Sequence, residues 1–253
     1  MLIIEQVAIG LVPIIIGFTA GRVWERAKLH LEYSYIRRLI AGKDRVQIVV
    51  SSVEISGFKY TAERPEIRSR VSVPRNVLYM PMAEGRAVAK LTALLHRVNP
   101  KVRVQLVTPR NHDPEIPTFS VGGPSVNAFS SRVLRNDFPD FKIEYPTTRR
   151  ARYGGQVFET RSDGNNMITG DYGFIFLTKI SKGVPCVIFC GIRAFGSSMA
   201  VELFGELSAR SEAAKLVSHG RKSLIVAEGS VDGLEEFAVS LAFCRELPAR
   251  QER

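Results

Sequence analysis

The feature that most constrains the fold is an alternation of short apolar, β-branched runs with longer segments of helical periodicity. Residues 46–53 (VQIVVSSV) and residues 102–108 (VRVQLVT) have the composition of strands, and the first suits a strand that is covered on both faces. Residues 83–98, between them, carry apolar side chains at helical spacing and end at Asn99-Pro100. This strand, helix, strand order predicts a mostly parallel sheet with covering helices.

The second half of the chain adds strands that are joined by short turns. Residues 172–180 and 184–190 are apolar and are separated by three residues, which predicts an antiparallel hairpin. Residues 223–228 (SLIVAE) form a last apolar run, and residues 233–247 fit either a strand or a helix, of which we favour the strand. The predicted fold class is α/β, with a Rossmann-like mixed but mostly parallel sheet and flanking helices.

The N-terminal segment has the length and composition of a membrane span. Residues 1–20 (MLIIEQVAIGLVPIIIGFTA) are apolar apart from Glu5, Gln6 and Thr19, and a helix of this length can cross a bilayer. The only early side-chain charge is negative, which argues against a cleaved signal peptide. The aromatic and basic residues that begin at Arg22 indicate a membrane boundary rather than a core helix. We therefore expect residues 1–21 to be a transmembrane anchor.

Charge asymmetry around this segment predicts its orientation. No Lys or Arg precedes the segment, whereas basic residues follow it closely, so the N-terminus is expected outside and the C-terminal domain in the cytoplasm. The expected organisation is an anchor at residues 1–21, a juxtamembrane helix at 22–42, a cytoplasmic α/β domain at 43–247 and a tail at 248–253. The apolar stripe of the juxtamembrane helix leaves two partners open, its own domain or a second copy in a homo-oligomer.

A first glycine-rich loop follows the apolar residues 118–121 and precedes a segment of helical periodicity. Pro124, just after the glycines, suits the first turn of a helix. Backbone N–H groups at a helix start attract phosphate or carboxylate, and glycines let a ligand approach the main chain. Ordinary turn glycines would give the same pattern. The candidate ligand-binding residues of this loop are Gly122, Gly123, Ser125 and Asn127.

A second glycine-rich loop connects an apolar strand to a predicted helix. Its spacing resembles the P-loop pattern G-x4-G-K-[ST], with Gly191 and Gly196 as the glycines, but Ser197 occupies the lysine position. The loop therefore predicts an anion cradle in which Arg193 replaces the missing cation, unless its serines only cap the helix. The candidate ligand-binding residues of this loop are Gly191, Arg193, Gly196, Ser197 and Ser198.

Composition and motifs leave catalysis unassigned. The chain has 3 cysteines and 4 histidines in 253 residues, with no metal-binding spacing, no HExxH motif and no GxSxG nucleophile elbow. We therefore assign no catalytic residue, no metal ligand and no cofactor. Carboxylates that could act at strand ends are Glu54, Asp171 and Glu228.

The net charge of +10 at pH 7 favours anionic partners. A basic segment at residues 149–155 keeps nucleic acid open as a partner, although no nucleic-acid-binding motif accompanies it. With the two glycine-rich loops, these features predict a single-pass membrane protein whose cytoplasmic domain binds a phosphorylated small molecule, with a nucleotide favoured. Two alternatives stay open: a hydrolase or glycosidase acting on a nucleotide such as NAD, and a non-catalytic membrane-tethered interaction domain.

Overall fold

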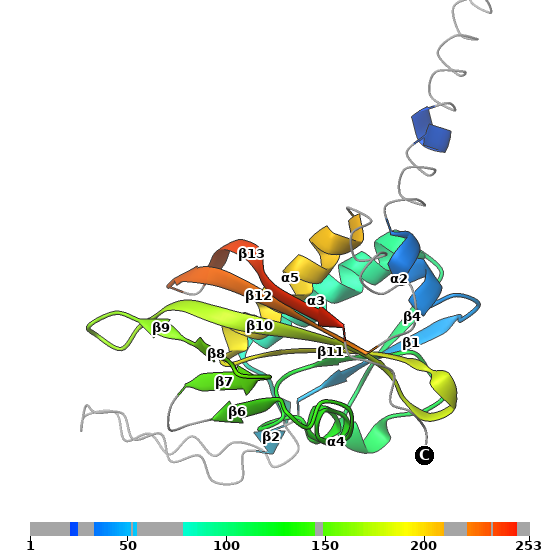
Figure 1. Ribbon diagram of the computed structural model, residues 1–253. Helices are drawn as coiled ribbons and strands as arrows, with labels where there is room; N and C mark the ends of the chain where they lie inside the picture. The colour runs from blue at the N-terminus through cyan, green and yellow to red at the C-terminus, as the bar shows by residue number, and fades with distance from the viewer. Residues whose placement is uncertain are drawn as a thin grey trace, which may run out of the picture.

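The structure is a computed structural model, and it describes most of the chain. The described residues are 21–24, 33–51, 53–54, 78–144, 149–209, 222–233 and 235–246. They form one large, curled sheet that is covered by helices, with two smaller sheets beside it (Figure 1).

The central sheet has eight strands. They follow the order β13-β12-β10-β11-β5-β1-β4, and the short β9 pairs with β10 beside this path. The strands are β1 (Arg45–Val50), β4 (Arg103–Val107), β5 (Thr118–Val121), β9 (Arg161–Ser162), β10 (Ile168–Lys179), β11 (Pro185–Gly191), β12 (Ser223–Asp232) and β13 (Glu235–Glu246).

The central sheet consists of a parallel half and an antiparallel half. β4, β1, β5 and β11 run parallel, whereas β10, β12 and β13 pair with their neighbours in antiparallel fashion. The predicted hairpin of residues 172–180 and 184–190 is confirmed as β10 and β11. The strand favoured for residues 233–247 is confirmed as β13.

Helices cover both faces of the central sheet (Figure 1). α2 (Ser34–Leu39), α3 (Met82–Val98) and α5 (Ala194–Ala209) share one hydrophobic core, and α4 (Ala128–Asp137) belongs to a second core. Consecutive residues of β10 alternate between these cores, because successive side chains of a strand point to opposite faces. A strand buried on both sides therefore needs the nearly continuous apolar run that its sequence shows.

Two smaller sheets complete the described structure. β6 (Lys142–Glu144), β7 (Arg150–Tyr153) and β8 (Gln156–Glu159) form an antiparallel sheet, and β2 (Val53–Glu54) pairs with β3 (Leu78–Tyr79). Phe158 of β8 packs on Phe174 of β10, with 5.5 Å between their ring centroids. The small sheet of β6, β7 and β8 therefore covers the same face of the central sheet as α4.

The predicted Rossmann-like, mostly parallel sheet is wrong. The parallel part is limited to β4, β1, β5 and β11, and strands rather than helices dominate the C-terminal half. The physical reason is the length of the connections. Residues 180–184 join β10 to β11, and residues 233–234 join β12 to β13. Neither connection is long enough for a crossover helix, so each pair must be antiparallel.

The predicted transmembrane anchor is a second correction. Residues 1–20, residues 25–32 of the predicted juxtamembrane segment and the tail at 248–253 lie outside the described residues. None of the helices that the structure describes is both long enough and apolar enough to cross a bilayer. The single-pass architecture, the membrane partner and the orientation derived from them are therefore withdrawn. Hydropathy measures only apolar length, a property that membrane spans share with segments buried in protein.

The described end of the juxtamembrane segment packs on its own domain. α2 places Tyr35 against Phe204 of α5, with 6.1 Å between their ring centroids in an edge-to-face arrangement. Ile36 is fully buried in the same core. Within α2, the apolar stripe seen in the sequence therefore serves the intramolecular core.

Candidate functional site

The candidate site lies at the carboxyl ends of the parallel strands. From β1 the chain runs through α3 to β4, and it then returns to β5 on the other side of β1. α3, which leads from β1 to β4, and α4, which follows β5, belong to the cores on opposite faces of the sheet. The neighbouring ends of β1 and β5 are thus a topological switch point, where ligands bind in open α/β sheets.

A serine and a glutamate meet at this switch point. Ser51 directly follows β1, and Glu84 lies in the first turn of α3. The Ser51 hydroxyl donates a hydrogen bond to the Glu84 carboxylate, and the two residues are only 2% and 3% exposed. Burial raises the pKa of Glu84 above its usual value, and the hydrogen bond from Ser51 opposes that rise. The pair is a hydroxyl group next to a carboxylate of increased basicity.

Gly122, at the end of β5, faces this pair. Its backbone has a φ of +112°, and a Cβ there would lie 3.1 Å from Ser51 Oγ and 3.4 Å from Glu84 Oε1. Dihedral angle and contact distance both favour glycine. A Cβ on Gly123 would lie 3.7 Å from the carbonyl oxygen of Gly191. The two glycine-rich loops therefore lie side by side at the switch point.

Asn127 is the N-cap residue of α4. Its side-chain oxygen accepts hydrogen bonds from the backbone N–H groups of Phe129, at 3.1 Å, and Ser130, at 3.2 Å. Its amide group donates to Ser120 Oγ and to the carbonyl oxygen of Val121, both at 3.1 Å. This buried side chain therefore occupies N–H groups that the predicted anion site would offer to a ligand.

Asp171 closes the N-terminus of α5 in a similar way. Its buried carboxylate accepts hydrogen bonds from the N–H groups of Gly196 at 2.6 Å, Tyr172 at 2.9 Å and Arg193 at 3.2 Å. Burial raises the pKa of Asp171 to about 7, although these hydrogen bonds and the charge of Arg193 lower it. The predicted second anion cradle therefore already holds a carboxylate of the protein.

Gly196 packs backbone against backbone. A Cβ at this position would lie 2.0 Å from the carbonyl oxygen of Tyr172 in β10. Only a hydrogen atom fits between the start of α5 and this strand. Packing thus requires glycine at this position with or without a ligand.

The serines of the two loops have different surroundings. Ser125 is exposed, whereas Ser197 and Ser198 are buried in the first turns of α5. The hydroxyl of Ser198 donates to the carboxylate of Glu236 in β13. The structure brings Gly122, Gly123, Gly191, Arg193 and Gly196 to one edge of the sheet, and it directs Ser198 to a separate cluster. A role of these residues in ligand binding stays a prediction.

This separate cluster joins β13 to α3 and α5. Glu236 is ion-paired with Lys90 at 2.9 Å and Arg86 at 3.1 Å, and Lys90 also pairs with Glu202 at 2.7 Å. Burial raises the pKa of Glu236, but the hydrogen bonds from Ser198 and Lys90 and the nearby positive charges outweigh it and lower the pKa overall. The cluster fixes the outer strand to the helices.

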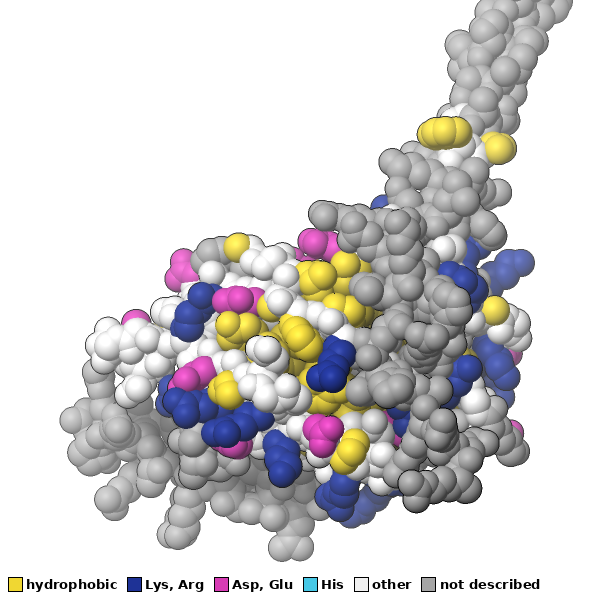
Figure 2. Space-filling model, viewed as in Figure 1, with side chains coloured by type: hydrophobic (Ala, Val, Ile, Leu, Met, Phe, Trp, Pro, Cys, Tyr) yellow, Lys and Arg dark blue, Asp and Glu magenta, His cyan; other side chains and the backbone are white. Residues whose placement is uncertain are grey.

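The basic segment at residues 149–155 is paired within its own small sheet. Arg150 lies 3.0 Å from Glu159, and Arg152 lies 2.9 Å from Glu144. Figure 2 shows basic side chains interspersed with acidic ones on the visible face. Local pairing reduces the positive charge that this segment offers to a phosphate backbone.

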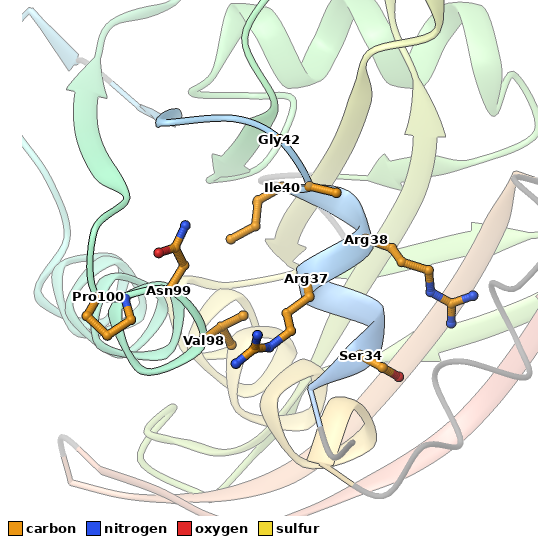
Figure 3. A pocket seen from close by; sticks show the side chains of 9 residues that line it. Ser34, Arg37, Arg38, Ile40, Gly42, Val98, Asn99 and Pro100 are labelled. Atoms are coloured by element: carbon orange, nitrogen blue, oxygen red, sulfur yellow. The ribbon is translucent and has the colours of Figure 1, made fainter. Parts of the chain in front are cut away.

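A hollow of about 650 Å³ lies between α2 and the C-terminal end of α3 (Figure 3). Arg37 reaches across it toward Val98, whereas Arg38 points away from it. The last carbonyl groups of a helix carry partial negative charge and attract cations. The Arg37 side chain therefore lies where the end of α3 favours positive charge, and this hollow is not our candidate site.

Sequence reasoning missed the pair of Ser51 and Glu84. The sequence pattern predicts Ser51 within a strand and Glu84 within an amphipathic helix, and neither pattern indicates that they meet. The available signal was one polar residue at the end of an apolar strand, Ser51 after β1, and another at the start of an amphipathic helix, Glu84 in α3. Among the described residues, no three His, Cys, Asp or Glu side chains gather in a way that could hold a metal ion.

Comparison with known proteins gives no family for the chain. No protein-family model matches the sequence, and no curated protein is significantly similar to it. The predicted function of a membrane-anchored nucleotide-binding domain, with its hydrolase and tethered alternatives, is therefore corrected. No described helix spans a membrane, no relative supports nucleotide binding, and the helix starts expected to hold phosphate are closed by Asn127 and Asp171.

Proposed function

We propose that the protein hydrolyses an uncharged ester, with Ser51 as the nucleophile and Glu84 as its general base. The observation that carries this proposal is the hydrogen bond from Ser51 to the buried Glu84 carboxylate at the switch point of the sheet. A serine nucleophile needs a base within hydrogen-bond reach to take its proton. A carboxylate with a raised pKa is a better base near neutral pH.

The reaction proceeds in two steps at this pair. Ser51 Oγ attacks the carbonyl carbon of the ester, and its proton passes to Glu84. The bond to the alcohol then breaks, and the alcohol leaves with the proton from Glu84. In the second step a water molecule takes the place of Ser51. Glu84 removes a proton from the water while the water oxygen bonds to the acyl carbon. Ser51 leaves with that proton, and the acid is released.

The electrostatics of this edge favour an uncharged substrate. Burial raises the pKa of the Cys190 thiol, and the charges of Glu84 and Asp171 raise it further, so both carboxyl groups act on one buried position. A phosphate group at this edge would be repelled by these carboxyl groups when they are ionised. An ester without ionised groups avoids that repulsion.

Labelling with a fluorophosphonate, which reacts covalently with activated serines, tests the proposal. We expect the probe to modify Ser51 in the full-length protein and Ser51→Ala to abolish the modification. Glu84→Gln keeps a hydrogen-bond acceptor but cannot take the proton, so labelling should slow by about 100-fold. Because both side chains are nearly covered, reaction requires local opening, and wild-type labelling should itself be slow.

Ser125→Ala is the matched control, because Ser125 lies in the adjacent glycine-rich loop and is exposed. This variant should be labelled at the wild-type rate. Labelling that persists in Ser51→Ala contradicts the assignment of the nucleophile. No labelling of the wild-type protein at high probe concentration contradicts the proposed function.

A further inference from the structure

A second polar hollow, of about 510 Å³, lies at the opposite edge of the sheet from Ser51 and Glu84. It is bounded by the loop that precedes β5, by α4 and by the turn that follows β10. Side chains that line it include His112, Phe129, Arg132, Val133, Lys179 and Ile180.

Hydrogen bonding determines which nitrogen of His112 carries a proton. His112 Nε2 lies 3.1 Å from Thr118 Oγ1. That hydroxyl donates its single hydrogen to the Ile116 carbonyl at 2.8 Å, and it accepts a hydrogen bond from Gln47 at 2.9 Å. It can therefore only accept from His112, so Nε2 carries the proton. In the neutral ring, Nδ1 is then a hydrogen-bond acceptor.

The surroundings of His112 keep its ring neutral at pH 7. Burial lowers the pKa of His112, and so does the positive charge of Arg132, whereas Asp113 raises it. Because the net change is a decrease from an ordinary value of 6.5, the unprotonated form predominates at neutral pH. The hollow thus offers a lone pair to a hydroxyl group.

Two cations stand beside this acceptor. The guanidinium of Arg132 lies 5.7 Å from the ring centroid of Phe129, and the ring of His112 packs on the same phenyl group at 4.4 Å. Lys179 is exposed at the end of β10. Within the described part of the chain, neither Arg132 nor Lys179 forms an ion pair.

The one carboxylate in the lining is already engaged. Asp137 accepts a hydrogen bond from Thr178 at 2.8 Å and is ion-paired with Lys222. Its charge is therefore largely offset where the hollow meets β10 and β12. The remaining lining combines positive charge with the apolar side chains of Phe129, Val133 and Ile180.

From this arrangement we propose that the hollow binds a small organic carboxylate that also carries a hydroxyl group. The carboxylate pairs with Arg132 and Lys179 in charge-assisted hydrogen bonds. The hydroxyl group donates to Nδ1 of His112, and the apolar body of the ligand contacts Ile180, which is half-buried in the lining. A small number of converging polar groups is what fixes the orientation of a ligand in a small-molecule site.

Calorimetric titration of the full-length protein with 4-hydroxybenzoate tests this site. We expect saturable binding that Arg132→Gln and Lys179→Gln each weaken by about tenfold. Arg135→Gln is the matched control, since Arg135 is exposed on the same helix but outside the hollow, and it should keep wild-type affinity. Unfolding midpoints without ligand establish that the variants are folded.

Related probes identify what the hollow recognises. Benzoate, which lacks the hydroxyl group, should bind more weakly, and 4-hydroxybenzyl alcohol, which lacks the carboxylate, should not bind. Binding of inorganic phosphate that depends on Arg132, without binding of 4-hydroxybenzoate, overturns the proposal in favour of a simple oxyanion site. No saturable binding of 4-hydroxybenzoate, or full affinity in Arg132→Gln, also overturns it. Ser51→Ala should leave this binding unchanged, so failure here is distinct from failure of the esterase proposal.

Discussion

At the scale of single residues, a buried carboxyl group makes the stability of this protein depend on pH. Asp171 is fully buried, and its pKa in the folded protein is about 7, compared with an ordinary value of 3.8. Between these two values the folded state binds a proton more tightly than the unfolded state does. The stabilisation is therefore complete below about pH 3.8 and is lost as the pH rises through about 7.

The first prediction concerns this loss of stability with rising pH. In the wild-type protein, the free energy of unfolding should decrease as the pH rises from 4 to 7. Asparagine cannot titrate, so Asp171→Asn should reduce this slope by up to the amount that corresponds to one bound proton. Urea titrations at several pH values measure this slope. Asp140→Asn, at an exposed aspartate, should keep the wild-type slope. An unchanged slope in Asp171→Asn would mean that Asp171 is ionised throughout this range.

A second prediction at the residue scale concerns the contact between α5 and β10. Because a Cβ on Gly196 would lie 2.0 Å from the Tyr172 carbonyl oxygen, Gly196→Ala should destabilise the protein by about 3 kcal/mol. Gly205→Ala is the control in the same helix, since its nearest new contact is Leu94 at 3.8 Å. That change should stabilise by about 0.5–1 kcal/mol. Denaturant unfolding measures both, and a neutral Gly196→Ala contradicts the packing argument.

At the scale of elements, β13 depends on side chains for its attachment to the helices. It is an edge strand of the central sheet, and Glu236 connects it to Arg86 and Lys90 of α3 and to Ser198 of α5. The Glu236 side chain is 2% exposed, so its charge relies on these partners rather than on water. Removing one member of such a cluster leaves the others partly desolvated and unpaired.

The third prediction tests this attachment. Glu236→Ala should lower the free energy of unfolding by about 3 kcal/mol and increase hydrogen exchange in β13. Glu202→Ala removes the more exposed partner of Lys90 and should cost less than about 1 kcal/mol. A cost of less than about 1 kcal/mol for Glu236→Ala, with unchanged exchange in β13, would show that the backbone ladder holds the strand without this cluster.

At the scale of the whole molecule, the net charge of +10 predicts weak, sequence-independent attraction to polyanions. The arginines of β7 contribute little to this attraction, because Arg150 and Arg152 pair with Glu159 and Glu144. Binding to nucleic acid is then a property of the summed charge and not of one segment.

The fourth prediction follows from that distribution. Affinity for duplex DNA should fall steeply with salt, and the double variant Arg150→Gln, Arg152→Gln should change the slope of log affinity against log salt by less than about 1. Fluorescence anisotropy over a salt series measures the slope. A decrease of about 2 would identify β7 as the nucleic-acid interface instead.

Several elements could be predicted because their signals are local. The apolar runs that become β1, β10 and β11 and the helical spacing of residues 83–98, which fall in α3, depend only on side chains close together in the chain. The β10–β11 hairpin was predictable from its short connection. The position of both glycine-rich loops at carboxyl ends of strands followed from the order of elements.

What the sequence determined by itself was therefore the alternation of elements and the polar residues at their ends. Only the tertiary structure decided the order of the strands in the sheet, including the pairing of β10 with β12, and the partners of the polar groups. Ser51 meets Glu84 across 33 positions, and Asp171 meets Gly196 across 25. A glycine before a helix looks the same in sequence whether its N–H group faces a ligand or a buried carboxylate. The difference depends on a side chain from another strand, whose position periodicity does not encode.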